Sequence, residues 1–264
     1  MIFGKTVIIL LLVAASGWSQ NTIATRFDVP KNFVRQSNVT DSFGFFLQNL
    51  SLKSKTAKAK YFDGTFKSNE AYISVIDLPI GTKDLHQCAD AIMRLRADYF
   101  YKNKNFSKIH FNFTNGFRVD FVKWIQGYRI ALKGNKTSWI KIAKPSFDYQ
   151  TYWKYMEQIF QYAGTASLEK ELKKIDIQNL NIGDVFIKGG FPGHAVIVVD
   201  VAENAITKKK IFMLAQSYIP AQELQVLKNT KNIALSPWYD LDFGAELVTP
   251  EWTFLPSQLK RFQE

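Results

Sequence analysis

The chain has 264 residues, of which 47% are hydrophobic and 15% aromatic. This composition excludes an intrinsically disordered chain and is typical of a globular protein with a substantial apolar core. The formal net charge is +11, and a basic surface of this kind favours polyanionic partners.

The first 19 residues have the pattern of a signal peptide. Lys5 precedes the apolar run TVIILLLVAA, and SGWS supplies small residues before Gln20. The run is too short to cross a bilayer comfortably, and no second long apolar run follows it. We therefore expect residues 20–264 to be exported, into a periplasm or out of the cell, with no integral membrane segment.

Loss of Lys5 with the signal peptide would lower the net charge from +11 to +10. In an exported protein this charge favours anionic envelope polymers or lipid head groups over nucleic acid. A simpler interpretation stays open, in which the lysines of residues 52–60 and 207–210 only keep two loops solvated.

The predicted helices lie in the first two thirds of the chain. Asp41 or Ser42 would cap a short helix, and Asp63-Gly64 is a hairpin signal that follows it. A long helix is expected from about 84 to 102, and a further helix is expected to end at Gly164.

A strand pattern precedes the long helix in AYISVIDLPI, and strand-like and helix-like pieces follow it in KIHFNFTNGFRVDFVKWIQGYRIAL. The C-terminal third is predicted to be mostly β, with strands in DVFIK, HAVIVVD and KKIFMLAQS. Successive strands joined by short turns favour antiparallel pairing. We predict a single α+β domain over residues 20–264, with helices packed on an antiparallel sheet. Residues 20–80 would form an N-terminal extension of a core that spans about 81–264.

Cys88 is the only cysteine of the chain, so it cannot form an internal disulfide. Asp84 and Gln87 have the spacing of a capping box, which places Cys88 in or just after the first turn of the long helix. Unpaired N–H groups and the helix dipole stabilise a thiolate at such a position, and the thiolate is the nucleophilic form of cysteine.

A packed thiol is the competing interpretation of Cys88. Apolar residues recur around it at intervals of three and four, which puts Cys88 on the apolar face of the helix. His86, two residues away, would point to another face and is a poor base for the thiol. We expect His86 to contact solvent or the helix end.

His194 stands at the entrance of a strand, HAVIVVD, whose two faces are both apolar in the middle. A histidine buried there needs a hydrogen-bond partner. If the following hairpin is symmetric near Ala205, paired residue numbers sum to about 410, which puts Gln216 opposite His194 and Lys210 opposite Asp200. Gln216 could then fix the tautomer of the imidazole, whereas a slip of one residue would substitute Ala215 or Ser217.

Other candidate sites have weaker signals. The three histidines, His86, His110 and His194, lack the spacing of metal ligands, and no cofactor motif is present, so we expect neither a metal nor a cofactor. Ser217 and Asp120 could contact a substrate, or could be a turn hydroxyl and a structural carboxylate. Large aromatic residues, including Trp252, could stack on sugars or fill the core.

The order of these parts resembles that of papain-like hydrolases. NIGDVFIKGGFPGHAVIVVD is similar to the segment of NlpC/P60-type and CHAP-type cell-wall amidases in which Gly-Asp opens one strand and Gly-His opens the next. This resemblance implies a papain-like core with Cys88 as nucleophile, His194 as base and Gln216 as the residue that orients His194.

The chain departs from that pattern around the nucleophile. It has Gln87-Cys88-Ala89 where many such enzymes have Asp-Cys-Ser, or a cysteine followed by an aromatic residue. A glutamine that helps to form the oxyanion hole is also missing from GTKDLH. The backbone amides of Cys88 and Gln87 could take its place.

A second resemblance covers nearly all of residues 20–264. The segments that carry it are LHQCADAIMRLRADY, FTNGF, GDVFIKGGFPGHAVIVVD, LAQSYIPAQE, SPWY and TPEWTF. On these segments the chain is identified as a member of the domain of unknown function 4846 family, which consists mostly of exported bacterial proteins without an established activity.

Together these observations predict an exported papain-like thiol hydrolase that cleaves an amide bond in a peptide, including cell-wall peptides. His194 would take the proton of Cys88 to give a thiolate–imidazolium pair, and Gln216 would orient the ring. The alternative is a non-catalytic envelope domain of the same fold that binds peptide or glycan in the same groove.

Overall fold

The computed structural model describes residues 21–134 and 136–263. The signal peptide predicted for residues 1–19 lies outside this range. Within the range, none of the helices combines the length and the apolar character needed to span a bilayer.

Two long helices and several short ones form the helical part of the described residues. The α-helices are α1 (Ile23–Arg26), α2 (Phe43–Gln48), α3 (Cys88–Lys102), α4 (Phe121–Ile125), α5 (Tyr149–Tyr162) and α6 (Thr165–Glu171), and the 3-10 turns are Phe106–Lys108, Ile177–Asn179 and Pro256–Gln258. Ser42 caps α2, because its side chain accepts a hydrogen bond of 3.1 Å from the N–H of Phe45.

Most strands are short, and the longest, β9, lies in the C-terminal third. The strands are β1 (Phe33–Arg35), β2 (Tyr72–Val75), β3 (His110–Asn112), β4 (Arg118–Asp120), β5 (Tyr128–Lys133), β6 (Lys136–Lys141), β7 (Leu172–Lys174), β8 (Val185–Lys188), β9 (His194–Asn204), β10 (Lys210–Gln216), β11 (Gln225–Leu227), β12 (Tyr239–Asp240), β13 (Leu247–Val248), β14 (Thr253–Phe254) and β15 (Leu259–Phe262). At the predicted Asp63-Gly64 hairpin the chain does turn, but only a single bridge, Lys60 to Phe66, flanks the turn.

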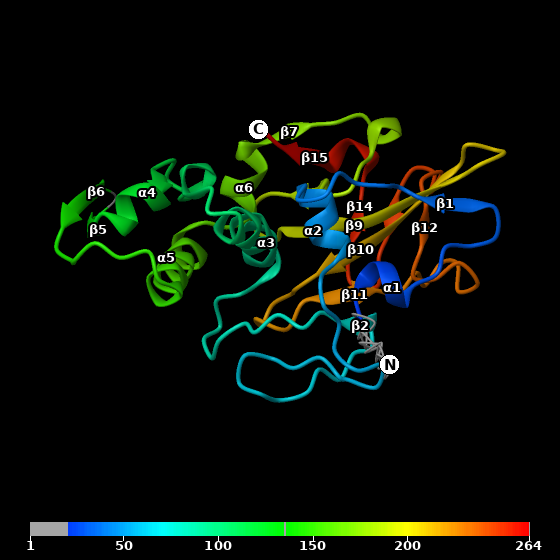
Figure 1. Cartoon of the computed structure of the whole chain (residues 1–264), viewed down its shortest axis with the longest axis horizontal. Helices are drawn as coiled ribbons and strands as arrows, with labels where there is room; N and C mark the ends of the chain where they lie inside the picture. The colour runs from blue at the N-terminus through cyan, green and yellow to red at the C-terminus, as the bar shows by residue number, and fades with distance from the viewer. Residues whose placement is uncertain (1–20, 135, 264) are drawn as a thin grey trace, which may run out of the picture.

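Nine of the strands form one sheet in the order β2-β11-β10-β9-β8-β15-β7, with β1 paired to β9 and β12 paired to β10. Every pairing is antiparallel, as expected from the short connections. The first strands, β1 and β2, come from residues 20–80 and join the same sheet as the C-terminal strands (Figure 1).

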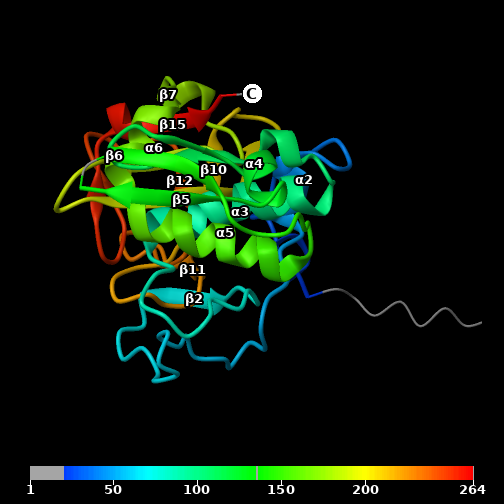
Figure 2. The same cartoon turned by 90° about the vertical axis from the view of Figure 1, so that its left-hand side faces the viewer.

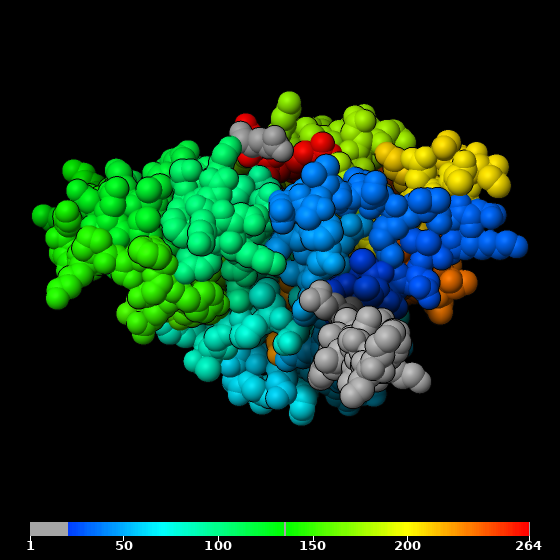
Figure 3. Space-filling model, viewed as in Figure 1, coloured from blue at the N-terminus to red at the C-terminus, as the bar shows by residue number. Residues whose placement is uncertain are grey.

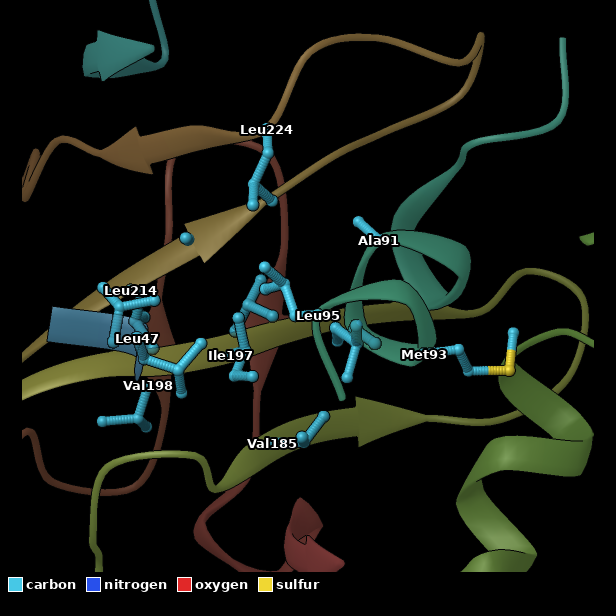
Figure 4. Packing of buried hydrophobic residues seen from close by; sticks show 14 of the residues in the cluster. Leu47, Ala91, Met93, Leu95, Val185, Ile197, Val198, Leu214 and Leu224 are labelled. Carbon is cyan, nitrogen blue, oxygen red and sulfur yellow. The ribbon is translucent and has the colours of Figure 1, made fainter. Parts of the chain in front are cut away.

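Both faces of the sheet are covered. On one face lie α2 and α3 (Figure 1), and in Figure 4 Leu95 of α3 points toward Ile197 of β9, while Met93 points away from the sheet. On the other face Phe186 and Phe212 contact Phe254 and Phe243 of the C-terminal segment. Because β9 is buried from His194 through Ala202, it forms the centre of the core.

Helix α3 begins four residues later than predicted, at Cys88 rather than Asp84. The carboxylate of Asp84 is engaged elsewhere, because it accepts hydrogen bonds from the Ala221 N–H at 2.7 Å and from the Gln87 side chain at 3.1 Å. Gln87 is the N-cap instead, and its N–H donates to the Asp90 carboxylate at 3.0 Å. Cys88 is therefore the first residue of the helix, where N–H groups have no intrahelical partner.

The predicted register of the β9–β10 hairpin is wrong. Asp200 lies opposite Met213 rather than Lys210, and a bulge between Met213 and Leu214 then shifts the pairing so that Ala215 lies opposite Ile197. Continuing this register puts Val196 opposite Gln216. The connection is not symmetric about Ala205, since β9 extends through Asn204 and the remaining turn is short.

Candidate active site

Cys88 and His194 line the same cavity, although 106 positions separate them in the sequence. The cavity has a volume of about 370 Å³ and lies where the start of α3 meets the start of β9. The chain after α5, the loop 190–193 and the side chains of Tyr218 and Trp252 complete its walls. The structure thus brings together two predicted site residues that the sequence placed far apart.

The glycine before His194 is required by close packing. A Cβ atom on Gly193 would lie 2.4 Å from the carbonyl oxygen of Gly190 and 2.5 Å from Oγ1 of Thr165. Both distances are far below van der Waals contact, so any side chain at this position would push the loop away from α6. Close packing therefore explains why a glycine precedes His194 at the start of β9.

Cys88 is only 5% exposed. Burial, together with the nearby Asp90 carboxyl, raises its pKa to about 11, although the N–H groups of Ala89 and Ala195 act in the opposite direction. Ala195 directly follows His194, so the thiol lies next to the backbone at the start of β9. At neutral pH the buried Cys88 is a thiol rather than a thiolate.

The His194 ring is held between aromatic side chains. Its centroid lies 4.7 Å from that of Tyr218 and 5.4 Å from that of Trp252, and only 1% of the residue is exposed. Burial lowers the pKa of His194 to about 4, and the charge of Lys67 also lowers it, whereas the hydrogen bond to the Gln216 oxygen acts in the opposite direction. The ring is therefore neutral at pH values well above 4.

Gln216 contacts His194 as predicted, in spite of the wrong register. The distance between Nε2 of His194 and Oε1 of Gln216 is 2.8 Å. This contact is diagonal across the two strands, because His194 and Val196 point to the same side of β9 and Val196 is the nearer to Gln216 in register.

A row of buried polar side chains continues behind Gln216. Nε2 of Gln216 donates to the Glu251 carboxylate at 2.5 Å, and that carboxylate is paired with the Lys67 ammonium at 2.8 Å. Burial lowers the pKa of Lys67, and the hydrogen bond to Glu251 opposes this shift. We call His194, Gln216, Glu251 and Lys67 the polar relay.

The polar relay fixes the tautomer of His194. Since the carboxylate of Glu251 can only accept when ionised, the Gln216 side chain must turn its NH₂ group to Glu251 and its oxygen to His194. That oxygen is an acceptor, so Nε2 of His194 carries the proton. The lone pair of the neutral ring then resides on Nδ1, which is the nitrogen able to accept a proton from a nucleophile.

Sequence reasoning missed Glu251, Lys67 and Tyr218. Glu251 and Tyr218 occur in segments that supported the family resemblance, TPEWTF and LAQSYIPAQE, but neither has a spacing that relates it to His194. Lys67 lies in a stretch without regular structure and reaches the site only through the fold. Nothing in the local sequence could have indicated the relay beyond Gln216.

The three residues predicted to bind substrate lie in different places. Gln87 lines the cavity, while its side chain donates to Asp84. Ser217 is buried and does not line the cavity; its hydroxyl lies 2.9 Å from the His86 carbonyl oxygen and 2.7 Å from that of Gln222. Asp120 ends β4 away from the cavity and is paired with Arg118 at 2.8 Å.

His86 is fully buried, so the expectation that it contacts solvent is wrong. Its ring packs edge-on against Phe160, and neither ring nitrogen has a hydrogen-bond partner among the described residues. Burial, with the charge of Arg94, lowers the pKa of His86 to about 3. Across the described residues, no three His, Cys, Asp or Glu side chains are grouped to hold a metal ion.

The pKa shifts disfavour the resting thiolate–imidazolium pair that the sequence suggested. With the Cys88 pKa near 11 and the His194 pKa near 4, both groups are neutral between these values. A neutral histidine with a lone pair on Nδ1 can still remove the thiol proton during attack, as a general base. Of the two backbone amides predicted to stabilise an oxyanion, the Gln87 N–H already donates to Asp90. The Cys88 N–H is the remaining candidate.

Residues 23–261 match the family described as Domain of unknown function (4846). This chain belongs to that family. The match runs from the first residue of α1 into β15 and hence covers the cavity, both long helices and the whole polar relay. A search of curated proteins finds no match, and a search of solved structures finds none either.

Proposed function

We propose that this protein is an exported papain-like thiol hydrolase that cleaves an amide bond in a peptide, with cell-wall peptides as the substrate class. The observation that carries the proposal is that a cysteine at the first residue of a helix shares a cavity with a histidine whose tautomer is fixed. A helix that opens with cysteine and packs on a sheet strand that opens with histidine supports the papain-like assignment.

In the proposed reaction, Sγ of Cys88 attacks the carbonyl carbon of the amide while Nδ1 of His194 takes the thiol proton. The N–H of Cys88, at the open N-terminus of α3, stabilises the oxyanion. The protonated His194 then gives its proton to the departing amine, leaving a thioester on Cys88. Water, deprotonated by His194, hydrolyses the thioester and restores the thiol.

A first test follows alkylation of Cys88 by iodoacetamide at pH 6, measured by mass spectrometry of the intact protein. We expect the replacement His194→Phe to slow alkylation on the order of 100-fold, because the general base is lost. His86→Phe is the matched control, since it removes the other buried histidine near α3, and alkylation should stay unchanged. Equal rates in the unmodified protein and in His194→Phe would contradict the proposal.

A second test looks for the reaction itself. The protein would be incubated with a mixture of peptides released from bacterial cell walls, and mass spectrometry would search for paired fragments whose masses sum to that of a parent peptide plus one water. Cys88→Ser should abolish the fragments. Their absence with the unmodified protein across such peptides would leave cell-wall peptides without support as the substrate class.

A binding domain without catalysis is the second candidate function, and two observations favour it. The pKa values of Cys88 and His194 disfavour the thiolate, which is the nucleophilic form of cysteine, in the resting protein. The rim of the cavity is also apolar and open, with Phe191 fully exposed and Ile219 53% exposed. In this case peptides or glycans should bind with equal affinity to the unmodified protein and to Cys88→Ser, and the alkylation rate should not depend on His194.

A further inference from the structure

Residues 121–147, which we call the basic arm, have an unusual charge composition. Among these 27 residues six are lysine or arginine and none is aspartate or glutamate. More than half of the chain's net charge of +11 thus comes from about a tenth of its length. The cations are Lys123, Arg129, Lys133, Lys136, Lys141 and Lys144.

The basic arm lies at one extremity of the molecule. It consists of α4, the β5–β6 hairpin and the segment that leads to α5. Figure 1 places the hairpin at the end farthest from the long strands of the sheet, and Figures 2 and 3 show the same region at the surface of that end. No residue of the basic arm lines the cavity of Cys88, so the basic arm has no part in the proposed reaction.

The cations of the basic arm keep their positive charge uncompensated. In the described part of the chain, none of the six forms a salt bridge with a carboxylate. Lys123 and Lys141 instead lie over the rings of Trp139 and Tyr128, each at 5.6 Å. These contacts hold the side chains in place without neutralising them.

Exposed apolar side chains accompany the cations. Ile142 and Phe147 are each 69% exposed, and Ile140 is 38% exposed. The register of the hairpin pairs Arg129 with Ile140, so Ile140 and a cation share one face. Ile130 and Trp139 are paired on the opposite face and pack against the core.

A hollow of about 670 Å³ lies next to these residues. Its lining includes Ile125, Tyr128, Lys141 and Phe147, so an apolar recess is bordered by a cation. Asp148 also lines the hollow, and its carboxylate accepts a hydrogen bond of 2.7 Å from the Thr151 N–H at the start of α5. The combination of an apolar recess and a cation fits a ligand with an anionic group and a hydrocarbon portion. A soluble polyanion would pair with the lysines but would not bury the exposed isoleucines and phenylalanine.

We propose that the basic arm docks on the surface of a bilayer that contains anionic lipids. Ile140, Ile142 and Phe147 enter the interfacial region, while the lysines contact the lipid phosphates. Membrane surfaces bind amphipathic elements through buried apolar area together with attraction between basic residues and anionic head groups. Docking of this kind would hold the enzyme proposed above beside a membrane, but it does not depend on that activity.

The test measures sedimentation of the full chain with vesicles of phosphatidylcholine that contain phosphatidylglycerol, and with vesicles of phosphatidylcholine alone, at 0.1 M salt. We expect binding to the anionic vesicles only. Replacing Lys133 and Lys136 by serine should weaken it about 25-fold, since a basic residue near an anionic surface is worth about fivefold in binding. The matched control, Lys55→Ser with Lys58→Ser, removes two exposed lysines elsewhere and should bind as before.

A second pair of variants separates a membrane from a soluble polyanion. Ile140→Ser with Ile142→Ser retains every charge and should weaken vesicle binding about tenfold through lost apolar burial. If these serines have no effect while loss of Lys133 and Lys136 abolishes binding, the arm recognises charge alone and the proposal of membrane docking is overturned. Equal binding by the lysine variant and its control overturns it as well.

A fluorescent label locates the docking surface independently of residues 1–20, which are identical in all variants. An environment-sensitive dye would be attached at Ser138→Cys, on the hairpin, in a chain whose own cysteine is replaced by serine. The dye should shift to shorter wavelength with anionic vesicles, whereas the same dye at Lys209→Cys should not. A shift at position 209 alone would place the contact elsewhere.

Discussion

His194 and His86 are both buried near the start of α3, and burial lowers the pKa of both. Their surroundings otherwise differ. His194 is hydrogen-bonded to Gln216 and through it to the ion pair of Glu251 and Lys67, whereas both ring nitrogens of His86 have no partner in the described structure.

This difference shows that burial alone does not fix the tautomer of a histidine. Burial suppresses the charge of either ring, but it does not decide which nitrogen holds the proton. Only the polar relay does so, by presenting an acceptor to Nε2 of His194. His86 instead acts as an apolar ring against Phe160, in spite of being two residues from Cys88.

The largest expected effect concerns the end of the relay. Glu251→Ala would leave the Lys67 ammonium buried without its carboxylate, and the side chain of Lys67 is only 2% exposed. We expect the free energy of unfolding in urea to fall by about 3 kcal/mol at pH 7, because an unpaired buried charge is costly.

Two further results would sharpen the assignment to the ion pair. The free energy of unfolding that Glu251→Ala loses should be smaller at pH 9 than at pH 7. Burial lowers the pKa of Lys67 in the folded state, so the folded variant can release the Lys67 proton in this pH range while the unfolded chain still holds it. The double variant Glu251→Leu with Lys67→Met should recover most of the stability. A loss under about 0.5 kcal/mol in Glu251→Ala would show that the pair is effectively solvated.

Acid stability tests the unpartnered histidine. The pKa of His86 falls from 6.5 to about 3 on folding, so between these values the unfolded chain binds the proton and the folded chain does not. Stability therefore decreases as pH falls through this window. His86→Phe should lose about 2 kcal/mol less than the unmodified protein between pH 7 and pH 5.

Urea unfolding at the two pH values measures that difference, and the buried carboxyl groups cancel because both proteins contain them. Parallel curves for the unmodified protein and His86→Phe would mean that His86 is protonated in the folded state, which would require a partner that the structure does not contain among its described residues.

The smallest effect concerns Ser217, which connects the two histidine regions. Its hydroxyl lies within hydrogen-bond distance of the His86 carbonyl oxygen, and it directly follows Gln216. Ser217→Ala should lower the free energy of unfolding by about 1 kcal/mol and leave alkylation of Cys88 unchanged. A large change in alkylation with little change in stability would favour a role in binding substrate.

Several features of the fold follow from local patterns. The apolar run of β9 predicted a buried internal strand, and the spacing of Ser42 before an apolar segment predicted the cap of α2. Helix α3 does not begin at Asp84, a good cap by composition, because the Asp84 carboxylate accepts a hydrogen bond from the Ala221 N–H, 137 positions away. No local rule anticipates such a competitor.

The register of β9 and β10 shows a similar limit. The turn residues locate a hairpin, but a bulge between Met213 and Leu214 changes the pairing by one residue. Side chains repeat every two residues along a strand, so a diagonal contact still joins His194 to Gln216. The predicted contact is correct although the alignment from which it was derived is wrong.

The sequence by itself determined the family, an antiparallel sheet with helices, and the identity of three candidate site residues, because periodicity, turn chemistry and the rarity of cysteine and histidine are local properties. Only the tertiary structure decided that Cys88 and His194 share a cavity and that Glu251 and Lys67 stand behind Gln216. Protonation was likewise decided there, because burial and hydrogen bonding set the pKa of a side chain and both depend on residues distant in the chain.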